Sequence, residues 1–155
     1  MKKTLFALAM IVLLLMNFSC KKEDPNDAAA SFSAKVQGTQ WTAATISSSH
    51  LTGGNLTQII AAGAMPSEQI ALTFHGSGTG TFVMDDDYNV CTAVIGDYTF
   101  TSMFSDSPDG EIIITRYDAA NGKISGTFHF KGEDIDGNEF SVTEGKFTNV
   151  ELIVM

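Results

Sequence analysis

The residue with the clearest chemistry in the sequence is Cys20, which ends the N-terminal run MKKTLFALAMIVLLLMNFSC. Two positive residues, Lys2 and Lys3, precede an apolar stretch from Leu5 to Met16, and the small residue Ser19 stands just before the cysteine. This order is typical of a bacterial lipoprotein signal, in which a peptidase cuts before the cysteine and the new N-terminus carries lipid. The sequence therefore predicts that the chain is held at a membrane through lipid on Cys20.

Two other interpretations of the N-terminus compete with lipidation. A membrane-spanning helix needs about 20 apolar residues, and this stretch is shorter. Secretion after an ordinary cleavage is the stronger alternative, because Asn17 and Phe18 depart from the Leu and small residue that lipoprotein signals prefer. We expect a signal peptide at residues 1–19, a lipidated cysteine with a flexible tether at residues 20–30, and one domain at residues 31–155.

A second group of residues has the spacing of metal ligands. Asp134, Asp136 and Asn138 alternate in a way that calcium loops use to present oxygen atoms. The glycine of such a loop should be sixth from the first Asp, where Glu139 stands, and the twelfth position holds Gly145 in place of Glu. We therefore favour a polar hairpin loop over a metal site, and no cofactor is expected.

The signals for catalysis are weak. His50, His75 and His129 could in principle form a zinc site, but strand alternation predicts that His75 and His129 face solvent, and the sequence does not place the third ligand that zinc would need. Cys91 lies in an apolar run and is expected to be a buried free thiol. The sequence has no G-x-S-x-G element to anchor a hydrolase triad, so we expect a protein that is not an enzyme, with an uncharacterised hydrolase as the weakest alternative.

Four aromatic residues are the candidates for a ligand-binding surface: Trp41, Tyr88, Tyr98 and Tyr117. Together they would suit a platform on which sugar rings stack. Trp41 is the only tryptophan, however, and a single tryptophan in a strand-rich domain is usually a core residue. The aromatic residues thus leave a glycan, a peptide or a protein partner open.

Composition narrows the choice of partner. Residues 31–155 contain five basic residues and fifteen carboxylates, which gives a net charge of about −10. Such a field repels nucleic acid and anionic headgroups, so no nucleic-acid partner is expected. It accepts neutral glycans, cations and basic peptides.

These residues must be positioned by strands, because segments rich in Thr, Val, Ile and Phe alternate in polarity and are separated by Gly, Asn, Asp and Pro. The short connections favour antiparallel neighbours. We predict a single antiparallel β-sandwich, with an up-and-down, lipocalin-like β-barrel around a small apolar ligand as the alternative. The predicted strands are residues 32–36, 40–47, 56–62, 70–75, 80–84, 90–95, 98–103, 111–117, 123–131, 139–143 and 146–152.

Two local geometries can be predicted in more detail. If Phe128 and Phe130 face the core, a three-residue loop ending at Gly122 places Ile114 opposite Phe128 and Ile112 opposite Phe130. Further on, Phe140 and Phe147 differ in parity. If both are buried, a bulge must absorb one residue, and we expect a special backbone conformation at Gly145.

Several short motifs together resemble those of small Bacteroidetes lipoproteins of unknown function. The matching segments are F-x-A-x-V-x-G-x-x-W from Phe32 to Trp41, the Gly80-Thr81-Phe82 element, S-G-T-F-x-F from Ser125 to Phe130, and G-x-F-x-N-V from Gly145 to Val150. The resemblance implies an all-β lipoprotein at the outer membrane, facing the surface or the periplasm. It implies no catalytic residues. In that phylum a run such as Lys21-Lys22-Glu23-Asp24 resembles a signal for surface export.

Overall fold

The computed structural model describes residues 28–85, 88–104 and 109–155, and all of its regular structure is strand apart from two short 3₁₀ turns. The strands are β1 (Ser31–Val36), β2 (Thr39–Thr42), β3 (Thr45–Leu51), β4 (Leu56–Ala62), β5 (Glu68–His75), β6 (Gly80–Val83), β7 (Val90–Ile95), β8 (Tyr98–Thr101), β9 (Gly110–Asp118), β10 (Lys123–Glu133) and β11 (Glu139–Val154). The 3₁₀ turns are η1 (Thr52–Gly54) and η2 (Ser102–Phe104). The predicted all-β class is confirmed, and within the described residues no helix has the length and apolar character needed to cross a membrane.

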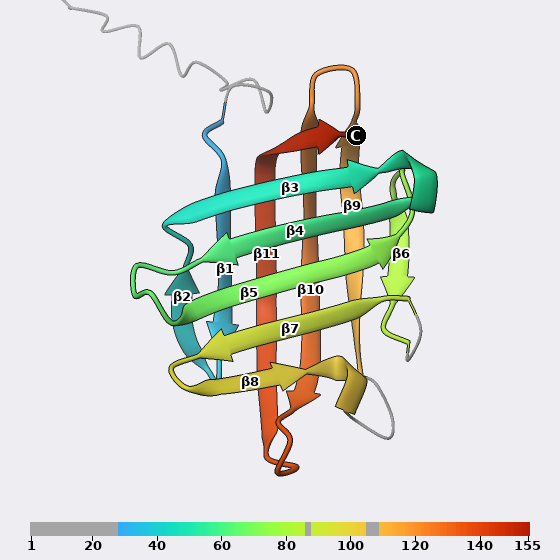
Figure 1. Cartoon of the computed structure of the whole chain (residues 1–155). Helices are drawn as coiled ribbons and strands as arrows, with labels where there is room; N and C mark the ends of the chain where they lie inside the picture. The colour runs from blue at the N-terminus through green and yellow to red at the C-terminus, as the bar shows by residue number, and fades with distance from the viewer. Residues whose placement is uncertain (1–27, 86–87, 105–108) are drawn as a thin grey trace, which may run out of the picture.

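The strands form two layers that cross one another (Figure 1). The front layer contains β3, β4, β5, β7 and β8, and the back layer contains β2, β1, β11, β10, β9 and β6. This is the orthogonal form of sheet packing, in which long strands pass from one layer to the other at the corners. β11 does so at its C-terminal end, where Leu152–Val154 leaves the back layer and pairs with β3.

Hydrogen bonds also join the layers into a closed ring. The ring runs β11-β3-β4-β5-β7-β8-β10 and closes through the β10–β11 pair, while β1 with β2 and β9 with β6 extend beyond it. The structure thus combines the stacked layers of a sandwich with barrel-like closure. The β11–β3 pair is parallel, so the sheet is mixed, while the other strand pairs among the described residues are antiparallel, as the sequence predicts.

Apolar side chains fill the space between the layers. Ile70, Leu72 and Phe74 of β5 are fully buried, as their alternation predicts, and Phe128 and Phe130 of β10 point into the same core. Cys91 lies among them as the buried free thiol that the sequence predicts, and burial raises the pKa of its thiol. His75 and His129 are exposed, also as predicted.

The predicted strand at residues 40–47 is two strands. The chain crosses between the layers at Ala43 and Ala44: the Ala43 N–H donates to Phe32 O in the back layer, and the Ala44 N–H donates to Ala62 O in the front layer. The predicted break between residues 143 and 146 is absent, because β11 continues through a bulge.

The β9–β10 register differs from the prediction. The loop spans residues 119–122, one residue more than predicted, and a bulge between Ile114 and Arg116 shifts the pairing again. Phe128 therefore lies opposite Ile112, not Ile114. Both isoleucines still face the core, and Gly122 has the expected positive φ of 60°.

The predicted bulge in β11 is present, but the residue with the unusual backbone conformation is Glu144 and not the predicted Gly145. Phe128 pairs with Gly145 and Phe130 pairs with Val142, so one extra residue of β11 is accommodated between them. Glu144 has a φ of 51°, while Gly145 is not in the left-handed region. Gly145 is needed for space, since a Cβ atom there would lie 2.5 Å from Phe128 O.

Candidate functional site

The predicted lipidation residue, Cys20, lies outside the described residues. The first described residue, Ala28, is held at the start of the domain because the Asn149 side-chain amide donates to Ala28 O at 2.9 Å. The N-terminal segment therefore joins the domain beside the C-terminal half of β11.

The Asp134–Asn138 segment forms a closed hairpin loop between β10 and β11. The Asp134 carboxylate accepts hydrogen bonds from the backbone N–H groups of Asp136 and Asn138, both at 2.9 Å, and from the Asn138 side chain at 2.8 Å. These donors lower the pKa of Asp134. The carboxylate is thus engaged by the loop itself, and no group of three or more His, Cys, Asp or Glu side chains in the described residues is placed to hold a metal ion.

The four predicted aromatic residues lie at different places, and no ring contact between described residues joins two of them. Tyr88 packs edge-on against His75, and Tyr117 packs edge-on against the buried His50. Tyr98 stacks on Phe100 and pairs with Ile95. Burial raises the pKa of Tyr117. Binding by these aromatic residues stays a prediction.

Trp41 is positioned by a tight hairpin. Gln37 and Gly38 have φ angles of 48° and 78°, and Val36 pairs directly with Thr39, which is the pattern of a two-residue type I′ turn. Across the hairpin, Trp41 faces Ala34. The turn glycine of the F-x-A-x-V-x-G-x-x-W motif is therefore needed for the backbone that returns Trp41 to the core.

The Trp41 ring is held on two sides. It packs edge-on against Phe32 with ring centres 6.0 Å apart, and its indole N–H donates to Glu68 Oε2 at 3.1 Å. Glu68 begins β5 in the front layer, so this hydrogen bond links the two layers. Gly63 leaves the room for it, because a Cβ atom there would lie 2.5 Å from Glu68 Oε2.

A groove of about 480 Å³ opens beside Trp41, where the edge strand β2 meets the ends of β5 and β7; we call it the edge groove. Its volume lies within the range of ligand sites, about 300–1,000 Å³. Its lining combines apolar side chains with uncharged polar ones, and Glu68 is its charged residue. The lining residues are Val36, Gln37, Thr39, Gln40, Trp41, Thr42, Ala64, Glu68, Ile95 and Phe140.

Contacts between neighbouring residues fix the shape of the edge groove. Phe140 is buried and stacks on Phe100 with ring centres 4.2 Å apart and an interplanar angle of 10°. The Gln37 side-chain oxygen accepts hydrogen bonds from the Ser141 N–H at 3.1 Å and the Ser141 hydroxyl at 3.0 Å, which fixes the β1–β2 turn to β11. The groove is thus preformed by residues from several strands.

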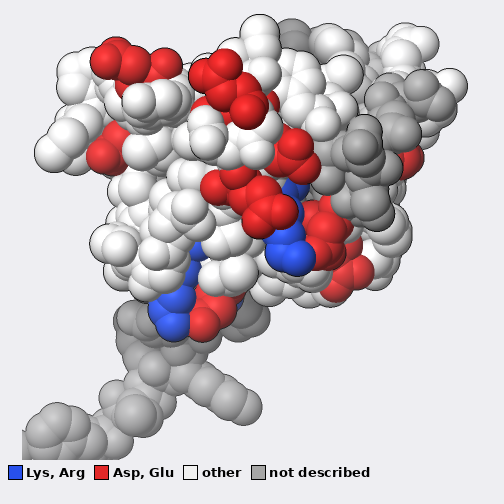
Figure 2. Space-filling view, turned by 90° about the horizontal axis from the view of Figure 1, so that it is seen from below, with Lys and Arg blue, Asp and Glu red and all other residues white. Residues whose placement is uncertain are grey.

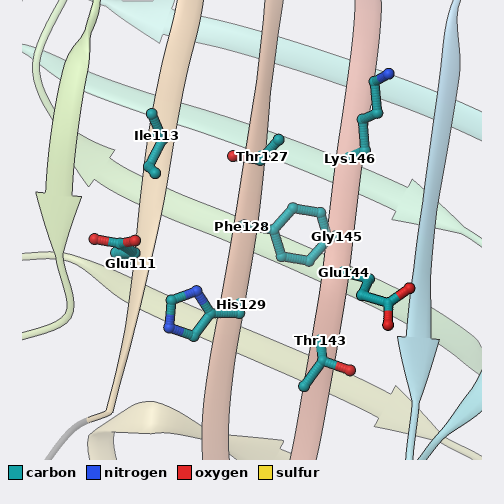
Figure 3. A pocket seen from close by; sticks show the side chains of 9 residues that line it. All are labelled: Glu111, Ile113, Thr127, Phe128, His129, Thr143, Glu144, Gly145 and Lys146. Atoms are coloured by element: carbon teal, nitrogen blue, oxygen red, sulfur yellow. The ribbon is translucent and has the colours of Figure 1, made fainter.

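A second hollow of about 530 Å³ lies on the outer face of β9, β10 and β11; we call it the outer hollow (Figure 3). Its side chains include Ile113, Thr127, His129 and Lys146, which project from three neighbouring strands. His129 stands opposite Glu111 in the ladder, and within the described part of the chain no hydrogen bond or ion pair joins these two side chains. The outer hollow thus has no assembled acid–base pair.

Carboxylates gather at the end of the molecule that carries the β10–β11 loop (Figure 2). Part of this charge is neutralised, since Lys131 pairs with Asp109 at 2.7 Å and this contact lowers the pKa of Asp109. The remaining field favours cationic or neutral ligands over anions.

The fold defines an all-β protein of two crossed layers, with a preformed groove at one edge strand. The chain belongs to the family described as Domain of unknown function (DUF6252), whose model matches residues 28–151. No curated protein and no solved structure matches the chain. The family match covers β1 to β10 and β11 as far as Glu151.

Trp41 is the residue of the edge groove that the sequence predicts as a candidate for ligand binding, and the other lining residues are not predicted. Glu68, Ile95 and Phe140 come from distant parts of the chain and meet only because β2 lies beside the ends of β5 and β7. The available signal was the indole N–H of Trp41, since a buried tryptophan normally requires an acceptor.

Proposed function

We propose that this protein is a lipid-anchored binding module of the cell envelope, without enzymatic activity, that holds its ligand in the edge groove. The observation that carries the proposal is the groove itself, which combines the buried aromatic rings of Trp41 and Phe140 with exposed amide and hydroxyl side chains of β2. Pockets that combine a broad apolar surface with a few fixed polar groups are the usual form of a ligand site.

The anchor part of the proposal rests on the sequence around Cys20 and on the resemblance to outer-membrane lipoproteins of Bacteroidetes. The described domain begins at Ala28, so a lipid on Cys20 would leave a tether of a few residues before the fold. A short tether of this kind places the domain at the membrane surface, facing outward or toward the periplasm.

The anchor is tested by expressing the full chain with Cys20→Ala and, as the matched control, with Cys91→Ala. Wild type and Cys91→Ala should sediment with membranes and incorporate labelled fatty acid, whereas Cys20→Ala should do neither. Membrane association and labelling that survive Cys20→Ala would refute the anchor.

The groove is tested with two residues of the same type. Ile95 lines the edge groove and Ile113 lines the outer hollow, and both are half-buried strand residues. A panel of neutral oligosaccharides and short peptides is screened by thermal shift against the full-length chain in detergent. A ligand at a hundred times its dissociation constant stabilises the fold by about 2.7 kcal/mol.

Ile95→Thr should weaken binding at least fivefold, and Ile113→Thr should leave it unchanged. The opposite pattern would move the site to the outer hollow, and a panel without any ligand would refute binding of these two classes in the groove. The melting temperature of each variant without ligand reports whether the fold is intact.

A further inference from the structure

The edge of β2 that faces away from β1 is an open backbone edge, and we propose that an extended, basic peptide segment adds to it as a strand and lies in the edge groove. This inference rests on the proposed function, because it names the class of ligand for the same groove. Three observations support strand addition: the hydrogen-bond pattern of β2, the residues that line the edge groove, and the charge of the domain.

The hydrogen-bond pattern fixes which backbone groups face the open edge. Ladder-bonded and unbonded pairs alternate along two antiparallel strands. The Ala43 N–H donates to Phe32 O at 2.9 Å, so this pair of residues is hydrogen-bonded. Because bonded and unbonded pairs alternate, Trp41 also exchanges hydrogen bonds with β1, and its two neighbours do not. The backbone N–H and C=O groups of Gln40 and Thr42 therefore point away from β1, and β2 pairs with no other strand among the described residues.

Apart from its short length of four residues, β2 has no feature that protects this edge. Natural sheets block exposed edges with Lys, Pro or an inward charge, because an open ladder accepts a further strand. The β2 sequence is Thr-Gln-Trp-Thr, with none of these. A segment docked here would gain main-chain hydrogen bonds from Gln40 and Thr42, which is how strand addition supplies affinity without reading sequence.

The edge groove supplies the side-chain contacts that strand addition also needs. A strand next to β2 lies about 4.8 Å from it, and its side chains alternate between the two faces. One set would then meet Ile95 and Phe140, while the other would face solvent. A peptide with an apolar residue at every second position fits this arrangement.

The negative charge of the domain favours basic peptides over acidic ones. Glu68 is the charged residue of the lining, and the domain as a whole is strongly acidic. A peptide with Lys or Arg is attracted by this field, and an acidic peptide is repelled. The chemistry therefore favours a basic, β-forming segment of another protein.

The experiment uses displayed random heptapeptides selected on the full-length chain in detergent, followed by affinity measurement of the selected sequences as synthetic peptides. We expect selected peptides with alternating apolar and polar residues and an excess of Lys and Arg. Thr42→Pro, which removes one outward N–H from the β2 edge, should weaken their binding at least tenfold.

The matched control is Thr81→Pro on β6, the strand at the other end of the sheet. The Met84 N–H donates to Gly110 O at 3.0 Å, so alternation makes the Thr81 N–H point away from β9 as well. Thr81→Pro should leave binding unchanged. Because Thr42→Pro could disturb β2 itself, the same peptides are also made with single backbone N-methyl groups, and methylation at alternate positions should abolish binding to the wild-type chain.

The other outcomes separate this inference from the proposed function. Peptides that bind in the groove but tolerate Thr42→Pro and N-methylation would overturn strand addition and leave the groove in place. Oligosaccharides that bind through Ile95 while no peptide is selected would also overturn strand addition and leave the groove as the ligand site. A dimer lost on Thr42→Pro would assign the edge to a second copy of the chain and also overturn the inference. If no probe of either class binds, both proposals fall.

Discussion

Asp118 shows how single side chains hold the loops of this fold. Its carboxylate accepts hydrogen bonds from the Asn121 backbone at 3.0 Å, from the Asn121 amide and from Arg116 at 2.9 Å. These donors lower the pKa of Asp118 to about 2. Arg116 in turn donates to the Asn149 side chain at 3.0 Å, so the β9–β10 loop is linked to the C-terminal half of β11.

This arrangement predicts a pH dependence. Because the folded pKa of Asp118 lies below its ordinary value of 3.8, the carboxylate stabilises the fold above about pH 4 and loses that effect as pH falls toward 2. Asp118→Asn should therefore melt below wild type at pH 6, and the difference should shrink at pH 2. Thermal melts across this range measure it.

The matched control for this prediction is Asp97→Asn. Asp97 is exposed in the β7–β8 turn and has no hydrogen bond or ion pair within the described part of the chain. Asp97→Asn should show a smaller difference from wild type than Asp118→Asn at pH 6. A difference for Asp118→Asn that stays constant from pH 6 to pH 2 would contradict the role given to its charge.

At the level of elements, the β1–β2 hairpin decides where the groove lies. Its turn requires two residues in the left-handed region, where glycine is favoured and other residues are strained. Gln37 accepts that conformation and anchors the turn through Ser141, while Gly38 carries the larger φ. The turn thus fixes the direction in which β2 returns and presents its open edge.

Gly38→Ala is expected to destabilise the fold by backbone strain alone, by about 1 kcal/mol, because no atom lies within 4 Å of a Cβ at this position. That loss corresponds to roughly 4 °C in the melting temperature of a domain of this size. Gly53→Ala is the control, since Gly53 is equally uncrowded but does not have a positive φ. Equal melting temperatures for the two variants would contradict the turn assignment.

The sequence predicted the strands and their buried faces, but it did not predict the register of β9 and β10. Alternation in polarity identified the strands and their buried faces, as Ile70, Leu72 and Phe74 show, because burial acts on each side chain locally. Register was not predictable in β9–β10, since the longer loop and the bulge near Thr115 each shift it by one residue. The β10–β11 bulge was found because two buried aromatics of unequal parity required it.

At the scale of the whole molecule, the closed ring of strands explains why the groove escaped prediction. Strand order depends on contacts between distant segments, and the parallel β11–β3 pair joins the last strand of the chain to the third. Periodicity carries no information on such pairings. The groove arises from this order, because it requires β2 to lie at the sheet edge beside the ends of β5 and β7.

The order of the strands also separates the two ends of the molecule. β1 begins at the end that carries the C-terminus, and the acidic β10–β11 loop lies at the opposite end (Figure 1). The strand β2 and the ends of β5 and β7, which contribute to the lining of the edge groove, lie along one side of the molecule. If the proposed lipid anchor holds the domain at the end where β1 begins, we expect the acidic end to lie away from the membrane.

Ligand in the edge groove can be detected directly at the single tryptophan of the chain. Because Trp41 is the only indole, its fluorescence and its one indole N–H resonance come from the groove. We would titrate the full-length chain with the selected peptides and oligosaccharides while following the ¹H–¹⁵N spectrum. With ligand in the groove, we expect the indole resonance to shift together with the backbone amide resonances of Gln40, Thr42 and Ile95. Shifts confined to Thr127, His129 and Lys146 in the outer hollow, with the indole resonance unmoved, would contradict this expectation.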